Sequence, residues 1–177
     1  QGLSQSSVYA IAQDYKGFIW IGTKDGLNKY DSRKIKIYRN NSKDSTSIGY
    51  NHIHSILEDS RRRLWIGTLR GLNLYDRDFD RFRRIAWSDL GIGEQEPLVY
   101  HIMENSMRQV YLATSNGIYR IKEAKVPVAE RIFDRKEANR KRVGKYFLNV
   151  NYIYESPQGK MWICAQEAVI SLRNGID

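Results

Sequence analysis

Two histidines spaced two residues apart are the first candidates for chemistry in this sequence. His52 and His54 fall on one face of an expected strand, as paired metal ligands would, because side chains i and i+2 of a strand point the same way. No carboxylate or cysteine accompanies them at ligand spacing, and His101 aligns with Ser55 on the opposite face. We therefore predict solvated or hydrogen-bonded histidines and no metal site.

Acidic residues offer a second kind of chemistry, a carboxylate pair for general acid–base catalysis. Asp14 and Asp59 recur at matching positions, where Asn105 stands in a third copy. A catalytic residue has no reason to recur in every repeat, whereas a side chain that holds the backbone two residues further on does. The sequence also lacks the G-x-S-x-G, H-E-x-x-H and glycine-rich phosphate-loop motifs. We expect turn-building aspartates, no catalytic residue and no cofactor.

Basic residues are the third candidates, and their chemistry is the binding of anions. Lys and Arg number 29 against 20 Asp and Glu, a formal net charge of +9, which favours anionic partners in general terms. Lys24 and Arg70 occupy matching turns, and a basic run contains Arg140, Lys141 and Arg142. We predict a binding site for an anionic ligand from these five residues, with solvated surface charge as the alternative. Nucleic acid is not expected as a partner, because the basic residues are not interleaved with exposed aromatics.

An internal repeat sets the elements that must position these residues. Residues 8–31 and 53–76 share the letters WIGT, GLN and YD at one spacing, 45 residues apart. Weaker copies at residues 99–122 and 150–173 keep the same apolar pattern. The alignment predicts equivalent second-strand positions for four aromatic residues, Trp20, Trp65, Tyr111 and Trp162.

Each copy is predicted to form four short strands joined by turns. Val8, Ala10 and Ala12 recur at a period of two, which predicts that the first strand is buried. Asp and Gly at the first and fourth positions of residues 14–17 are typical of a type I turn. Two residues after the recurring aromatic residue, every copy has a small side chain, as close packing between sheets requires. We therefore expect Cys164, which occupies this position in the fourth copy, to be buried. The four small residues are Gly22, Gly67, Ala113 and Cys164.

Four antiparallel strands about every 45 residues are typical of a β-propeller blade. We predict an all-β fold of four-stranded antiparallel blades at residues of about 7–39, 52–86 and 98–134, with an incomplete fourth at about 149–177. In such a disc the five candidate binding residues would share one face. The opposite face would carry further basic residues, namely Lys16, Arg33, Arg61, Arg62, Arg77 and Arg108.

These repeats resemble the regulator-propeller repeat in the extracytoplasmic sensor region of bacterial hybrid two-component histidine kinases. The resemblance rests on GLSQSSVYAIAQDYKGFIWIGTKDGLNKYD at residues 2–31 and on residues 64–72. It implies about four blades of an incomplete seven-bladed propeller, in the periplasmic part of an inner-membrane protein whose histidine kinase lies elsewhere. The implied function is recognition of an oligosaccharide, acidic or sulfated given the net charge, in the regulation of polysaccharide utilisation, without chemistry by this chain.

Two other functions stay open at this point. One is a protein-interaction scaffold that binds no small ligand, and the less favoured one is a propeller polysaccharide lyase, which would need a clustered His, Tyr or Arg constellation. No run approaches the roughly 20 apolar residues of a membrane span, so no direct membrane contact is expected. Because four blades cannot close a ring of seven, we expect the exposed blade edges to make the chain a homo-oligomer.

Overall fold

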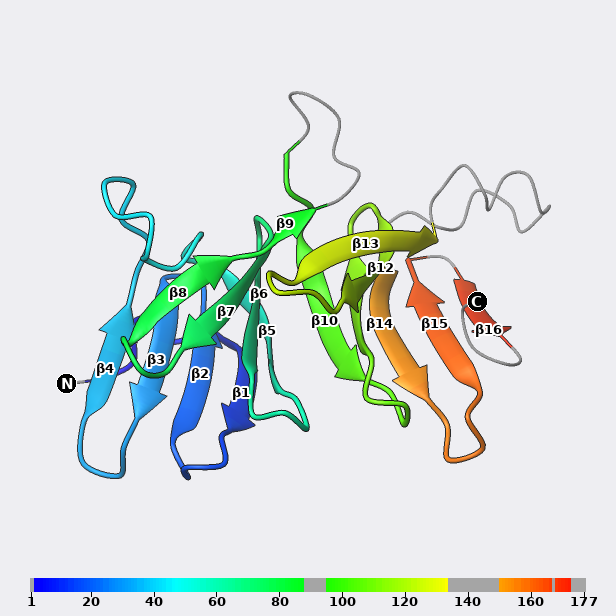
Figure 1. The fold of residues 1–177 in the computed structure, drawn as a ribbon. Helices are drawn as coiled ribbons and strands as arrows, with labels where there is room; N and C mark the ends of the chain where they lie inside the picture. The colour runs from blue at the N-terminus through cyan, green and yellow to red at the C-terminus, as the bar shows by residue number, and fades with distance from the viewer. Residues whose placement is uncertain (1, 88–94, 134–149, 167, 173–177) are drawn as a thin grey trace. The chain divides into compact units, whose positions relative to one another are not determined.

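The computed structural model describes residues 2–87, 95–133, 150–166 and 168–172, which form β-strands and turns without a helix (Figure 1). In these residues there is accordingly no helix long and apolar enough to cross a membrane. The strands assemble into four separate, mostly antiparallel sheets, which confirms the all-β fold. The chain divides into two compact units, Gln1–Ile85 and Ala86–Asp177.

The first unit contains two four-stranded sheets whose strands follow chain order. We call β1 to β4 the first sheet and β5 to β8 the second sheet. Each neighbouring pair is antiparallel, as short turns between consecutive strands require. The strands are β1 (Val8–Gln13), β2 (Ile19–Thr23), β3 (Gly26–Tyr30), β4 (Ile35–Tyr38), β5 (Ile53–Glu58), β6 (Leu64–Thr68), β7 (Leu72–Asp76) and β8 (Arg81–Arg84).

The second unit contains the third sheet, in the order β10-β11-β12-β13-β9, and the three-stranded fourth sheet, β14-β15-β16. The short strand β9 pairs in parallel with β13, a contact that the repeat pattern does not indicate. The strands are β9 (Ala86–Trp87), β10 (Val99–Glu104), β11 (Val110–Thr114), β12 (Gly117–Lys122), β13 (Val128–Phe133), β14 (Val150–Glu155), β15 (Met161–Ala165) and β16 (Ala168–Leu172).

The core of the first unit lies between its two sheets, where β5 packs against β1 and β2. Gly22 on β2 permits this approach, because a Cβ atom there would lie only 2.6 Å from Cγ2 of Ile53 on β5. Trp20 and Ile53 are both fully buried. The cluster consists of Trp20, Leu27, Tyr38, Ile48, Ile53, Leu64, Ile66, Tyr75 and Phe82.

The second unit repeats this packing, with β14 against β10 and β11. Ala113 takes the place of Gly22, and Val150 takes the place of Ile53 in the same buried cluster. The expectation that small second-strand residues serve close packing between sheets is therefore confirmed for Gly22 and Ala113. The cluster consists of Tyr111, Ala113, Ile118, Val150, Ile153, Met161 and Ile163.

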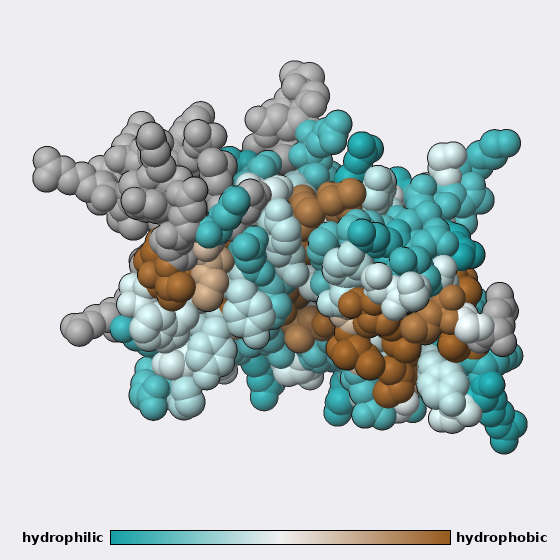
Figure 2. Space-filling view, turned by 180° about the vertical axis from the view of Figure 1, so that it is seen from behind, coloured by the Kyte–Doolittle hydropathy of each residue, from teal (hydrophilic) through white to brown (hydrophobic). Residues whose placement is uncertain are grey.

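Two expectations about burial are wrong. The first strand β1 is not buried: on the face expected to be buried, Val8 is 47% exposed and Ala10 and Ala12 are only half-buried. Ile53 and Val150, at the position of Val8 in their copies, pack against a preceding sheet of their own unit, and Val8 has no such sheet in the described residues. Cys164 is half-buried rather than buried. Figure 2 shows hydrophobic areas among hydrophilic residues on the face seen from behind.

The alignment of the aromatic positions is confirmed. Each of the four residues is the second residue of its sheet's second strand, which is β2, β6, β11 or β15. The first three are buried, while Trp162 is 36% exposed. The four copies therefore fold alike despite their diverging sequences.

Candidate functional site

The turn between the second and third strands positions the two predicted cations that the structure describes. In the first sheet Thr23 is fully buried, and its hydroxyl donates to the Gly26 carbonyl at 3.1 Å. In the second sheet the buried hydroxyl of Thr68 accepts the Arg70 N–H at 3.1 Å. Each threonine therefore closes its turn from within. The side chains of Lys24 and Arg70 are left exposed at the tips.

Both cations lie beside an aromatic ring. The Lys24 ammonium is 5.8 Å from the centroid of Tyr9, and the Arg70 guanidinium is 5.4 Å from that of Tyr50, within the range of cation–π attraction. His52 joins the two turns: its carbonyl accepts the N–H of the residue before Arg70 at 3.0 Å, and the charge of Lys24 acts on its imidazole. We call Tyr9, Lys24, Tyr50, His52 and Arg70 the turn face.

The two histidines form a stack. The rings of His52 and His54 are 4.3 Å apart and inclined by 29°, and Tyr9 meets His52 edge-on at 4.9 Å. Burial lowers the pKa of both imidazoles, that of His54 to about 4, and the Lys24 charge lowers the pKa of His52 further. Both rings are therefore neutral at pH 7. Within the described ranges no three His, Cys, Asp or Glu residues gather to hold a metal ion.

One basic residue expected to be solvated is instead half-buried and held in ion pairs. The side chain of Arg77 is 14% exposed; its guanidinium lies 2.6 Å from the Asp14 carboxylate and also pairs with Glu58. Arg77 thus ties the first sheet to the second, and its assignment to solvated surface charge is wrong. The other residues of that group are exposed, namely Lys16, Arg33, Arg61, Arg62 and Arg108. Three predicted binding residues lie outside the described residues, namely Arg140, Lys141 and Arg142.

The recurring aspartates build turns, as predicted. One carboxylate oxygen of Asp14 accepts two backbone N–H groups of its own turn, at 3.0 Å each, and the other accepts the indole N–H of Trp20 at 2.8 Å. Asp59 repeats the arrangement with Trp65, also at 2.8 Å. Burial raises the pKa of Asp14, but the bonds from Trp20 and Arg77 outweigh it and hold that pKa below its usual value. An ionised, fully bonded carboxylate is not a general acid.

The third copy shows why the acid and the tryptophan occur together. Tyr111 stands where the first two copies have tryptophan, and its hydroxyl donates to the Gln109 side chain at 3.0 Å. Gln109 in turn receives a bond from the Asn105 amide at 3.2 Å. A neutral amide therefore suffices where no indole N–H is buried.

A cluster around Asp80 joins strand β4 of the first sheet to strand β7 of the second sheet, and the sequence analysis did not predict it. The Tyr38 hydroxyl donates to Asp80 at 2.6 Å, and Tyr75 and Lys36 bond the same carboxylate. Burial raises the pKa of Asp80, but these bonds outweigh it and lower it to about 2. Burial and Asp80 raise the pKa of Tyr75 to about 12. Near neutral pH the cluster holds its protons in place, so its role is structural.

Comparison with known proteins identifies the repeats. Residues 2–25 and 47–70 match the two component regulator propeller family, and both segments end at the turn of a candidate cation. A histidine kinase, P4, of Formosa agariphila is 66% identical over 47 residues, which are 27% of this chain and 3% of that protein.

Two solved structures are similar in fold. The extracellular domain of the hybrid two component system BT4673 from B. thetaiotaomicron matches 94% of this chain with a TM-score of 0.75 and 22% identity. Virginiamycin B lyase from Staphylococcus aureus matches 94% with a TM-score of 0.62 and 13% identity. The chain spans 23% of the first protein and 52% of the second. The chain has a propeller-like fold and carries repeats of the two component regulator propeller family.

Proposed function

We propose that this chain is part of the extracytoplasmic, periplasmic sensor region of a hybrid two-component system and recognises acidic or sulfated oligosaccharides. Two matched family repeats and the fold shared with an extracellular domain of such a system support a sensor role. In this proposal the chain binds the signal and regulates polysaccharide utilisation through a kinase domain elsewhere in the whole protein.

The turn face supports the ligand class, because it combines an exposed cation with an aromatic ring in two successive repeats. The face of an aromatic ring offers an apolar surface to a sugar ring. The planar guanidinium of Arg70 suits a carboxylate or sulfate bidentately, and Lys24 adds a point charge. His52 is neutral between them, so it neither repels the cations nor attracts the anion.

Calorimetric titration tests this proposal with two tetrasaccharides, chondroitin 6-sulfate and unsulfated cellotetraose. We expect the chain to bind the sulfated sugar, and Lys24→Gln combined with Arg70→Gln to weaken binding by about tenfold or more. The control Arg33→Gln removes an exposed charge from a different turn and should leave binding unchanged. Binding of cellotetraose without binding of the sulfated sugar would refute the acidic ligand class.

A protein-interaction scaffold remains the second candidate, and the exposure of β1 favours it. Val8, Tyr9 and Ile11 are large apolar side chains, each at least 42% exposed, on one edge strand. Apolar side chains gathered on an edge strand are typical of association surfaces. This function predicts that the chain binds neither tetrasaccharide. It also predicts that the chain associates with a protein partner and that Ile11→Asn abolishes this association. A lyase would need clustered His, Tyr or Arg side chains, and the turn face brings Tyr9, His52 and Arg70 together, so this third function stays open.

A further inference from the structure

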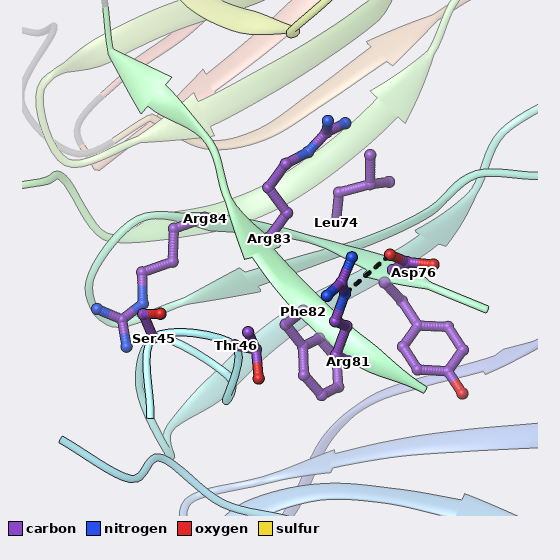
Figure 3. A pocket seen from close by; sticks show the side chains of 9 residues that line it. Ser45, Thr46, Leu74, Asp76, Arg81, Phe82, Arg83 and Arg84 are labelled. Carbon is purple, nitrogen blue, oxygen red and sulfur yellow. Dashed lines mark hydrogen bonds and ion pairs between the residues drawn. The ribbon is translucent and has the colours of Figure 1, made fainter. Parts of the chain in front are cut away.

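A second basic site lies at the outer edge of the second sheet, away from the turn face. It is a cavity of about 420 Å³, within the size range of small-molecule sites. Strand β8 forms one wall, and the connection between β4 and β5 forms another (Figure 3). The lining residues are Ser45, Thr46, Leu74, Tyr75, Asp76, Arg81, Phe82, Arg83 and Arg84.

The hydrogen bonding of β8 aims a backbone donor at this edge. Ile85, just after the strand, donates its N–H inward to the carbonyl of Leu72 on β7 at 2.9 Å, whereas Phe82 donates outward to the Thr46 carbonyl at 2.8 Å. N–H groups of successive residues in an antiparallel strand point alternately to its two sides, so those of residues two apart point the same way. The N–H of Arg84, two residues after Phe82, therefore points outward as well.

The charges of the lining do not cancel. Its one carboxylate, Asp76, pairs with Arg81 at 3.1 Å. Arg83 and Arg84 are exposed, and in the part of the chain that the structure describes no ion pair joins either to a carboxylate. Figure 3 shows the two side chains leaving β8 in opposite directions, with the Arg84 side chain on the side of Ser45.

One further acid, Asp44, offsets only part of this positive charge. Two bonds from Thr46, at 2.7 and 2.8 Å, and the charge of Arg84 lower the pKa of Asp44, so its carboxylate is ionised, but no ion pair joins it to Arg84 in the described residues. Charged side chains on an edge strand also discourage strand pairing. That role, however, requires neither a cavity nor an outward N–H next to the guanidinium groups.

We propose that this cavity, which we call the edge pocket, binds an oxyanion through the Arg84 guanidinium, the Arg84 N–H and the Ser45 hydroxyl, while Arg83 adds positive charge from the other side of β8. The group recognised is a sulfate or carboxylate, either free or attached to a sugar. Guanidinium and backbone N–H donors are the usual partners of such groups. The edge pocket shares no residue with the turn face, so each site can fail its test while the other passes.

Titrations at constant ionic strength test the edge pocket with sodium sulfate, N-acetylglucosamine 6-sulfate and N-acetylglucosamine. We expect both sulfates to bind and to shift the Arg84 amide resonance in NMR spectra of the chain. The double variant Arg83→Gln with Arg84→Gln should bind at least tenfold more weakly, and Arg33→Gln, which removes an exposed charge elsewhere, should bind normally. Tighter binding of the sugar sulfate would identify a sulfated sugar as the ligand, and equal binding a free oxyanion.

Three results would overturn the proposal: no binding of either sulfate at millimolar concentration, unchanged binding by the double variant, or an equal loss with Arg33→Gln. Both arginines are exposed, so their replacement should not unfold the chain. Thermal unfolding of each variant without ligand checks this point. Loss of sulfate binding together with an unchanged melting temperature therefore reports on the pocket itself.

Discussion

Replacing Gly22 by alanine tests how closely the first and second sheets approach each other. The added Cβ would lie 2.6 Å from Cγ2 and 2.9 Å from Cβ of Ile53. Both contacts are far shorter than the 3.5–4.0 Å at which carbon atoms attract. The φ angle of Gly22 is not positive, so alanine brings no backbone strain. Any loss of stability therefore reports on the contact between the sheets.

The size of the loss follows from two opposing effects. Overpacking a buried site costs about 1–3 kcal/mol. Alanine in place of glycine also restricts the unfolded chain, which stabilises by about 0.4–1 kcal/mol. We therefore expect Gly22→Ala to lower the free energy of unfolding by about 1–2 kcal/mol. Gly2→Ala is a matched control, because nothing lies within 4 Å of a Cβ at that position.

The second unit suggests a rescue, because Ala113 there packs in one cluster with Val150 rather than isoleucine. Ile53→Val alone should cost about 0.5–1.5 kcal/mol. Added to Gly22→Ala it should cost less, because loss of Cδ1 gives the side chain room to shift, with a coupling of about 1 kcal/mol. Urea unfolding followed by fluorescence of Trp20, in the same cluster as Ile53, measures each variant. A fully stable Gly22→Ala, or strict additivity in the pair, would refute the close approach.

Four further predictions concern stability and assembly. Trp65→Ala should destabilise by about 3–5 kcal/mol and Arg62→Ala by about 0.5 or less, and equal denaturation midpoints would contradict their assignment to core and turn. Arg108→Gly should raise stability by about 0.5–1 kcal/mol in the same assay, because Arg108 has a φ of +60° in a turn where two other copies have glycine. As the pH falls from 6.5 to 4 the chain should lose stability, because His54 and His101, each with a pKa of about 4 in the fold against 6.5 unfolded, take up protons on unfolding. Each histidine should account for a loss of up to about 3 kcal/mol in the free energy of unfolding, and His101→Phe should remove the part of the loss that comes from His101. Light scattering should give a mass above the 20.7 kDa of one chain, and a monomer at high concentration would mean that the edges are protected.

The parts of the fold that recur could be predicted from the sequence. Asp14 and its turn are local, because a carboxylate reaches backbone N–H groups two and four residues ahead. The small residue Gly22 could be recognised because matching positions hold small residues throughout. Recurrence separates a structural requirement from chance, and it works wherever the same contact is made in every copy.

Contacts made once could not be predicted in this way. Arg77 and Asp14 are 63 residues apart, and Asp80 and Tyr38 are 42 apart, so no local period connects them. Exposed basic residues are the common case, and Arg77 differs only because Asp14 and Glu58 happen to face it. The exposure of Val8 has the same origin, since burial of a first strand depends on the sheet before it.

The same distinction bears on how such a repeat protein acquires its specificity. The residues that recur in the turn between the second and third strands are buried: Thr23, Thr68 and Thr114 each donate to a glycine carbonyl three residues on, at 2.8–3.1 Å. The tip residues do not recur, since Lys24 and Arg70 stand where the third copy has uncharged side chains. A turn whose shape is fixed from inside can change its tip without loss of fold. Under the proposed function, ligand choice is therefore to be sought at positions where the copies differ, which include both the turn face and the edge pocket.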